Sequence, residues 1–270
     1  VINDLAFHAK NDILIFTDAN TVFDKNALKN LVKGYTSEKI GGVSGRLILN
    51  EPKDNFDKSS QEKKYWEYET IIKKAEGKFG VLIGANGGIF SIRKKLFKEI
   101  PRAKAVTDDF FVSLAVLSQG YKFVYQYDSF AFEEVARSVD DEFKRKVRFA
   151  ATNFQTLFFF PDLLFNKNIL LSISFWSHKV IRWFIPFLLI LLFILSIWRS
   201  SYSDAVRVIL YVQLFFYGAS IVGKIGASFK LRLPFFSLAY FFVITNFALV
   251  LGFIRFLRGK HTVIWQSTPR

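Results

Sequence analysis

The stretch Asp12-Ile-Leu-Ile-Phe-Thr-Asp-Ala-Asn20 indicates the fold class of this chain. Residues 12–17 form an apolar run of strand length, and Asp18 and Asn20 follow at its carboxyl end. Such a run, followed by an acidic tip and a helix over residues 25–34, is typical of a parallel α/β sheet. In open sheets of this type, ligands bind outside the carboxyl ends of the strands. We therefore expect Asp18 and Asn20 to lie at the ligand-binding edge of an α/β domain.

The rest of the first 140 residues continues to alternate between helix and strand patterns. We expect helices over residues 2–9, 58–76 and 108–120, and strands over residues 42–50, 89–92 and 121–127. Either Asp108 or Asp109 is expected to cap the last of these helices, because a carboxylate accepts from the free N–H groups at a helix start. Gly120 is expected to end that helix in the left-handed conformation.

The composition changes sharply near residue 155, after which charged residues become rare. Three stretches, residues 183–198, 205–223 and 235–257, are almost free of charge. Because a helix of about 20 apolar residues spans the hydrocarbon of a bilayer, we expect about three transmembrane helices. The alternative is a set of buried core helices, which the number and length of these stretches in so short a region disfavour.

A basic amphipathic helix is predicted between the two parts of the chain. Apolar residues recur at helical spacing from Phe143 to Phe158, while Lys and Arg within residues 144–148 fall on the opposite face. Such a helix ahead of membrane spans lies most simply in the membrane interface, and Pro161 is expected to end it. The chain then divides into a catalytic domain over 1–140, an interface region over 141–168 and a transmembrane region over 169–270.

The formal net charge of +14 is interpreted as membrane charge, because many Lys and Arg residues lie at the ends of the apolar stretches. These are Lys179, Arg182, Arg199, Lys224, Lys230, Arg232, Arg255, Arg258 and Lys260. No zinc-ligand spacing or RNA-binding aromatic signature accompanies them, so nucleic acid is not an expected partner.

Cysteine is absent, which excludes disulfides and thiol chemistry. Since the chain starts with Val1 inside an expected helix, we expect sequence upstream to be missing and this fragment alone to be inactive.

Asp18 and Asn20 have the chemistry of a metal site. A carboxylate and an amide oxygen are ligands that a hard cation such as Mg²⁺ or Mn²⁺ accepts, and such an ion can hold a sugar diphosphate. The alternative is that Asp18 only caps the helix that follows.

Asp108 and Asp109 are candidates for acid–base catalysis. Capping requires one aspartate, and two adjacent carboxylates can raise one another's pKa, which suits a general base. We expect Asp109 to take the proton from an acceptor hydroxyl.

Arg145 and Arg148 are three residues apart and so share a helix face. We expect Arg148 to neutralise a departing diphosphate through bidentate contacts, although binding of lipid headgroups is an open alternative.

The glycines of Gly84-Ala-Asn-Gly-Gly88 either form a tight turn or let the backbone approach a donor sugar. His178, at the entrance of a span, is interpreted as structural.

Together, these motifs resemble those of the membrane-embedded family 2 glycosyltransferases, the processive group that includes cellulose, hyaluronan, chitin and poly-N-acetylglucosamine synthases. Asp18-Ala-Asn20 is similar to the D-x-D metal motif with its second Asp replaced, and Thr107-Asp108-Asp109 is similar to T-E-D. Arg145-x-x-Arg148-Phe149 stands where Q-x-x-R-W belongs, with Gln and Trp replaced. Phe132-Glu-Glu134, followed by Ser138, is similar to the stretch that leads to this last motif.

The resemblance implies a fold and a set of roles. The fold is a Rossmann-like glycosyltransferase-A type domain, here partial, followed by the interface helix and the transmembrane helices. Asp109 is the implied base, Asp108 is its neighbour in the catalytic motif, and Phe149 and Thr107 are the implied contacts to the acceptor. The implied donor contacts are Asp18, Asn20, Asn86, Gly87, Gly88, Arg145 and Arg148, with a divalent metal on Asp18 and Asn20.

We therefore expect an inverting glycosyltransferase of hexosyltransferase type. The donor is a nucleotide-diphosphate sugar, by resemblance a UDP-sugar, and the acceptor is a polysaccharide or a lipid-linked sugar at the bilayer. The expected location is the cell (plasma or inner) membrane, with the catalytic domain in the cytosol. The alternative is a non-catalytic membrane subunit of a polysaccharide synthesis or export complex that retains the fold.

Three full crossings place the basic C-terminus outside, which the preference of basic residues for the cytoplasmic side disfavours. One apolar segment is therefore alternatively interfacial or re-entrant.

Overall fold

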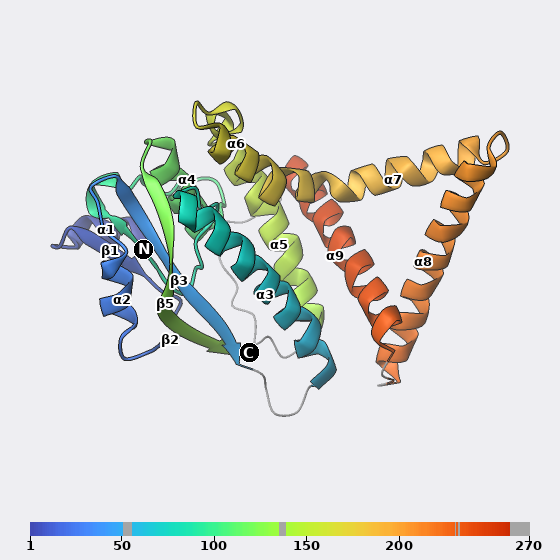
Figure 1. The fold of residues 1–270 in the computed structure, drawn as a ribbon, viewed down its shortest axis with the longest axis horizontal. Coiled ribbons are helices and arrows are strands. Elements are labelled where there is room, and N and C mark those ends of the chain that lie inside the picture. Colours follow the sequence, from blue (N-terminus) through green and yellow to red (C-terminus); the bar gives the residue numbers. More distant parts are fainter. Residues whose placement is uncertain (51–55, 135–138, 230, 232, 260–270) are drawn as a thin grey trace.

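The computed structural model describes the whole chain except residues 51–55, 135–138, 230, 232 and 260–270. It shows a mixed α/β domain with helices on the faces of its sheet, followed by three long apolar helices (Figure 1). The α/β class and the sequence of domain and apolar helices are confirmed. Ser138 and the basic residues Lys230, Arg232 and Lys260, all noted above, lie outside the described residues.

The described strands form one sheet in the order β1-β4-β3-β5-β2. Their bounds are β1 Ile13–Phe16, β2 Val22–Phe23, β3 Ile40–Asn50, β4 Phe90–Arg93 and β5 Lys122–Glu134. Only β3 and β5 pair in parallel, whereas β4 runs antiparallel to both β1 and β3, and β2 antiparallel to β5. The expectation of a parallel sheet is therefore wrong for most of its pairs, because β4 inserts between β1 and β3 in the opposite direction.

Strand β5 runs well past the expected end at Tyr127. The strand continues through Asp128 and Ser129, because a backbone carbonyl and a hydroxyl of these residues are hydrogen-bonded to helix α2 (Ala27–Lys33). Asn30 donates to the Asp128 carbonyl at 2.7 Å, and the buried Ser129 hydroxyl donates to the Ala27 carbonyl at 2.8 Å. With these groups satisfied, β5 continues along β3 to Glu134.

Helix α4 (Asp108–Ser118) lies against the sheet and supplies much of the core. Its residues from Phe110 to Leu117 are all buried, and they pack with Ile92 of β4 and Phe123 of β5. Thr107 occupies the N-cap position, so the expectation that an aspartate caps this helix is wrong. Both aspartates lie in its first turn instead, where negative charge is favoured by the helix dipole. Gly120 has a φ of 81°, as predicted.

Three further helices complete the domain: α1 (Ile2–His8), α2 and the long α3 (Phe56–Phe79), with a short 3-10 turn η1 (Lys94–Leu96) after β4. Helix α3 crosses one face of the domain (Figure 1) and contacts β5. Gly77 of α3 makes this approach possible, because a Cβ there would lie 2.4 Å from the Cβ of Tyr125.

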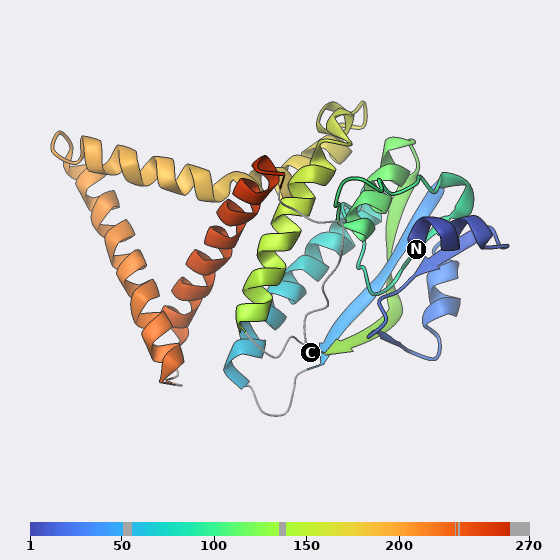
Figure 2. The same ribbon diagram turned by 180° about the vertical axis from the view of Figure 1, so that it is seen from behind.

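Helix α5 (Val139–Leu157) is the predicted amphipathic helix, and Val147, Ala150, Ala151 and Phe154 on its apolar face are buried. It ends before Pro161, which instead opens the 3-10 segment η2 (Pro161–Phe165). The apolar face packs against α9 (Pro234–Leu257), so it meets protein along this side. Figure 2 shows α5 between the domain and α9.

The apolar region folds into helices that agree with the three predicted stretches. Helix α6 (Ile169–Phe175), the π-helical turn η3 (Trp176–Val180) and α7 (Ile181–Arg199) follow one another directly, and α8 (Asp204–Ser228) and α9 complete the set. Among the described residues, 169–199, α8 and α9 are long and apolar enough to cross a membrane. In Figures 1 and 2, α7, α8 and α9 form an open triangle beside the domain.

Candidate active site

The two acidic motifs of the sequence meet in space. A Cβ placed on Gly87 would lie 3.2 Å from Oδ2 of Asp109 and 3.6 Å from Oδ2 of Asp18. The first carboxylate stands at the start of α4, and the second stands in the turn after β1. Since Gly87 has no side chain, both carboxylates can lie close to the backbone of the 84–88 loop.

Asp109 is held in place by the first turn of its helix. Its Oδ1 accepts from the Phe110 N–H at 2.7 Å, and its backbone carbonyl accepts from the buried Ser113 hydroxyl at 2.6 Å. Asp108 is exposed, and its Oδ1 accepts from the Asp109 N–H at 3.1 Å. The two carboxylates therefore differ: that of Asp109 is held near Gly87, and that of Asp108 is exposed to solvent.

Burial, together with a smaller effect of the negative charge of Asp108, raises the pKa of Asp109 to about 7. Lys73 and the hydrogen bond from Phe110 act in the opposite direction, whereas Asp18 adds a smaller upward effect. A carboxyl group with such a pKa can both accept and hold a proton near neutral pH, which is the property of a general base.

Asn20 lies two residues after Asp18 in a turn closed by the Thr21 N–H, which donates to the Asp18 carbonyl at 3.1 Å. Asn20 is exposed. Within the described part of the chain, no group of three or more His, Cys, Asp or Glu side chains is arranged to hold a metal. The donor set of Asp18 and Asn20 still fits a Mg²⁺-type ion, because such ions take one or two carboxylates and complete their shell with phosphate oxygens and water.

The loop that carries Gly87 is fixed by buried polar contacts. The Asn86 amide donates to the Gly45 carbonyl at 2.6 Å, its oxygen accepts from Lys73, and its backbone N–H donates to the Ser44 hydroxyl at 3.0 Å. The Asn86 side chain is thus used within the protein, so it positions the loop. A Cβ on Gly88 would lie 2.9 Å from the Thr21 hydroxyl oxygen, which brings the loop against the turn after Asp18.

Helix α5 closes another side of the site through Thr107. The Thr107 hydroxyl lies 2.7 Å from that of Thr152 and donates to the Asn153 oxygen at 2.8 Å. The backbone carbonyl of Arg148 accepts from Thr152 at 3.2 Å, so this arginine lies one turn away from the contact. The Thr107-Asp108-Asp109 segment and the Arg148 helix are therefore directly connected.

Arg145, Arg148 and Phe149 lie together on α5. The guanidinium carbon of Arg148 is 5.2 Å from the centre of the Phe149 ring, and this ring is 39% exposed. Partial burial, with a smaller effect of Arg145, lowers the pKa of Arg148. Two neighbouring guanidinium groups that reinforce each other's positive potential are suited to a diphosphate, and an exposed ring is suited to stacking on a sugar.

A buried charged network beside the site was missed by the sequence interpretation. On α3, Glu69 and Glu76 flank Lys73 at helical spacing, and both glutamates contact His178 of η3. Burial tends to raise the pKa of Glu69, but Lys179, His178 and Arg182 together hold it well below its usual range. Burial and the charge of Lys179 lower the pKa of Lys73 to about 8.

One sequence signal for this network existed. Residues 69, 73 and 76 form a charged stripe on one face of a helix, next to aromatic side chains that favour burial. The pairing of this stripe with His178, about a hundred residues later, is not encoded in any local pattern.

Comparison with known proteins gives a family and a fold. The sequence profile described as glycosyl transferase family group 2 matches residues 13–255. No curated protein sequence matches the chain. A similar solved structure is "Mannosyltransferase PcManGT from Pyrobaculum calidifontis in complex with GDP-Man and Mn2+", with 17% sequence identity and a TM-score of 0.57. The match covers 96% of this chain and 66% of that chain, so this chain spans a little less than two thirds of that protein.

Proposed function

The chain belongs to glycosyl transferase family group 2, and on that premise we propose that it catalyses inverting transfer of a sugar from a nucleotide-diphosphate sugar to an acceptor at the membrane. The observation that supports this most is the convergence of the Asp18 and Asp109 carboxylates on the bare backbone of Gly87. A shared role explains why residues so distant in the sequence meet at a position without a side chain.

In this proposal Asp109 is the general base. Its carboxylate accepts the proton of an acceptor hydroxyl, whose oxygen attacks the anomeric carbon while the bond from that carbon to the diphosphate breaks. One displacement without an enzymic nucleophile inverts the configuration at that carbon. Asp108 contributes by raising the pKa of this base.

The donor is bound between α5 and the turn after β1. Asp18 and Asn20 would hold a divalent ion, Mg²⁺ or Mn²⁺, which when bound supplies positive charge to the diphosphate. Arg148, assisted by Arg145, neutralises the leaving nucleotide diphosphate. The backbone of Gly87 and Gly88 allows close approach of the donor sugar, and Asn86 fixes that backbone in place.

The acceptor is proposed to be a polysaccharide or a lipid-linked sugar, because the domain that carries the site is followed by three helices that are able to cross a bilayer. The exposed ring of Phe149 is the proposed contact for the acceptor, with Thr107 fixing the loop beside it. A UDP-sugar follows from the resemblance to processive synthases, whereas the similar solved mannosyltransferase was determined with GDP-Man. Both nucleotide classes therefore belong in the test.

The test is a transfer assay with the full-length protein in native membranes, using labelled UDP- and GDP-sugars with Mg²⁺ or Mn²⁺. We expect covalent incorporation of label from one donor, and none in the presence of a chelator. Long polymer as product would indicate processive synthesis, and a single added sugar would indicate stepwise assembly. A folded protein that neither transfers nor hydrolyses any donor would overturn the proposal and favour a non-catalytic subunit.

A further inference from the structure

A buried histidine joins helix α3 to the first apolar helix of the chain. His178 is 4% exposed, with its Nδ1 2.7 Å from Oε1 of Glu76 and its Nε2 2.9 Å from Oε2 of Glu69. Each ring nitrogen is therefore within hydrogen-bond distance of one glutamate, and the ring bridges the two carboxyl groups. One side chain thereby connects two turns of α3 to the η3 segment.

The same face of α3 also holds the loop that carries Gly87. Lys73 lies between the two glutamates in the sequence, and its ammonium group donates to the Asn86 side-chain oxygen. The second carboxylate oxygen of Glu76 accepts from the Ile83 N–H at 3.0 Å. Helix α3 therefore contacts η3 through His178 and the active-site loop through Lys73 and Glu76.

Apolar contacts connect the same segment to the helix of the proposed base. Phe110, the residue after Asp109, packs with its ring 6.3 Å from that of Phe175 and 5.7 Å from that of Trp183, measured between ring centres. Lys179 approaches the loop itself, since its Cε would lie 3.8 Å from a Cβ on Gly84. Residues 175–183 thus contact both walls of the site, the loop and the start of α4.

We propose that His178 is a positioning residue, which acts through Glu69 and Glu76 to fix α3 against the first apolar helix and so holds Gly87 at its distance from Asp109. This inference rests on the proposed function, since it assigns His178 to the transfer reaction. Its physical basis is that small displacements of groups around a reacting centre have large effects on rate, up to about 100-fold for a shift of about 1 Å. Binding of the donor, which depends on Asp18 and Arg148, is affected much less.

The first test is His178→Gln in the full-length protein, because the donors of glutamine are on one nitrogen, whereas the two glutamates contact different ring nitrogens of His178. We expect kcat for sugar transfer to fall about 10- to 100-fold, with the KM for the donor changed by less than about 3-fold. Ser177→Ala, at the exposed neighbouring position, is the matched control and is expected to keep wild-type kinetics. A His178→Gln enzyme with wild-type kcat, or one in which the donor KM alone changes, would overturn the proposal.

A second measurement does not need turnover. Hydrogen exchange of the peptide covering residues 82–88 reports whether the loop is held, and it is expected to be faster in His178→Gln than in wild type and unchanged in Ser177→Ala. If His178→Gln does not fold, the double variant Glu76→Gln/His178→Gln is measured instead, because it removes the charge that loses its contact to His178 and keeps a side-chain oxygen for the Ile83 N–H. Unchanged exchange in this loop would overturn the positioning role. Absence of transfer in the wild type would overturn the proposed function instead, and the exchange result would still test His178.

Discussion

The protonation of Asp109 is the property of a single residue that most directly controls the proposed chemistry. With a pKa raised to about 7 by burial and by Asp108, its carboxylate form dominates only above that pH. The base form is therefore lost as the pH falls through this value, so kcat is expected to decrease on the acid side of the profile.

Asp108→Asn tests this cause. Removing the neighbouring negative charge lowers the pKa of Asp109, so the acid limb of the kcat profile is expected to move to lower pH than in wild type. The measurement is the pH dependence of transfer at saturating donor and a fixed saturating concentration of metal. The metal concentration is fixed because a bound cation lowers the pKa of Asp109 in both enzymes. Coincident acid limbs would contradict the assignment of Asp109 as the titrating base.

At the residue scale, the sequence identified the carboxylates but not their surroundings. Asp18 and Asp109 stand out because each follows or opens a regular element, and the structure brings them together at Gly87. The engagement of Asn86 with Gly45 and Lys73, and the pairing of His178 with two glutamates, depend on tertiary packing. No periodicity in the sequence carries that information.

At the scale of elements, the close packing of α5 against α9 connects the arginine-bearing helix to the apolar region. A Cβ on Gly252 of α9 would lie 2.3 Å from the Cβ of Ala150 and 2.8 Å from the Val147 carbonyl oxygen. These are backbone and short side-chain atoms that cannot rotate away, so the helices must separate to accept a larger residue.

Gly252→Ala is therefore expected to destabilise the folded protein by about 1–3 kcal/mol, the usual effect of overpacking a close contact. Gly218→Ala on α8 is the matched control, because nothing lies within 4 Å of a Cβ placed there. In a helix this change is neutral or stabilising by up to about 1 kcal/mol. The measurement is the unfolding midpoint of both variants in the same detergent, and equal midpoints would contradict the packing of α5 on α9.

The elements themselves were largely predictable, but their directions were not. Alternation and helical periodicity located β3, α3, α4 and the three apolar helices to within a few residues. The antiparallel insertion of β4 was missed because periodicity fixes which residues form a strand and not which neighbour it pairs with. The continuation of β5 past Tyr127 was missed because the partners of Asp128 and Ser129 lie on α2.

At the scale of the whole molecule, the contacts of α5 bear on how the chain crosses the membrane. The ring centres of Phe143 and Phe247 are 6.3 Å apart, and those of Phe158 and Phe256 are 5.3 Å apart. Helices α5 and α9 therefore run side by side in the same direction. The ammonium group of Lys146 lies 4.2 Å from the centre of the Phe241 ring and donates to the hydroxyl of Thr245, near the middle of α9, at 3.4 Å. A charged helix along the flank of α9 is incompatible with the centre of a bilayer.

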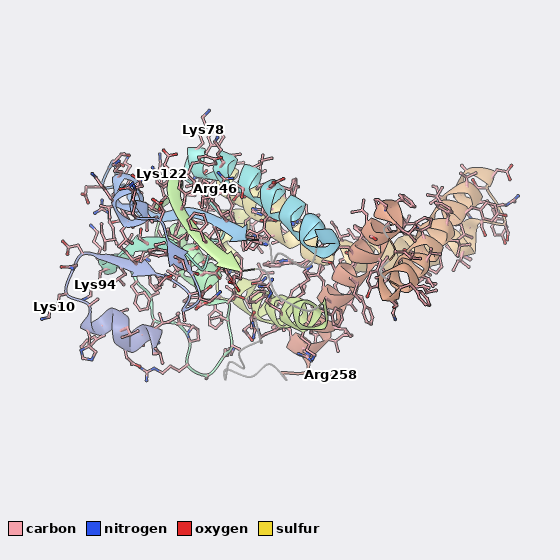
Figure 3. All side chains as sticks on the ribbon, turned by 90° about the horizontal axis from the view of Figure 1, so that it is seen from below. Lys10, Arg46, Lys78, Lys94, Lys122 and Arg258 are labelled. Carbon is pink, nitrogen blue, oxygen red and sulfur yellow. The ribbon has the colours of Figure 1, made fainter. Side chains whose placement is uncertain are left out.

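We therefore predict that α9 lies along the membrane interface with α5, and that residues 169–199 and α8 make the two crossings. Arg258 then lies on the same side of the membrane as the catalytic domain, because it follows the end of α9, the helix that packs on α5 (Figure 3). Since the chain has no cysteine, Arg258→Cys and Lys25→Cys give clean single labelling sites in sealed vesicles. Both are expected to react with an impermeant thiol reagent from the same side, and labelling from opposite sides would contradict this arrangement.

The most direct test of the central claim is Asp109→Asn in the full-length protein, measured for both sugar transfer and donor binding. Asparagine has nearly the size of aspartate but cannot accept the acceptor proton, so transfer is expected to fall by about 100-fold or more. The dissociation constant of the donor is expected to stay within about 3-fold of wild type, because Asp18, Asn20 and Arg148 remain. An Asp109→Asn protein that transfers sugar at the wild-type rate, or that loses donor binding in proportion to transfer, would contradict the role of Asp109 as the base.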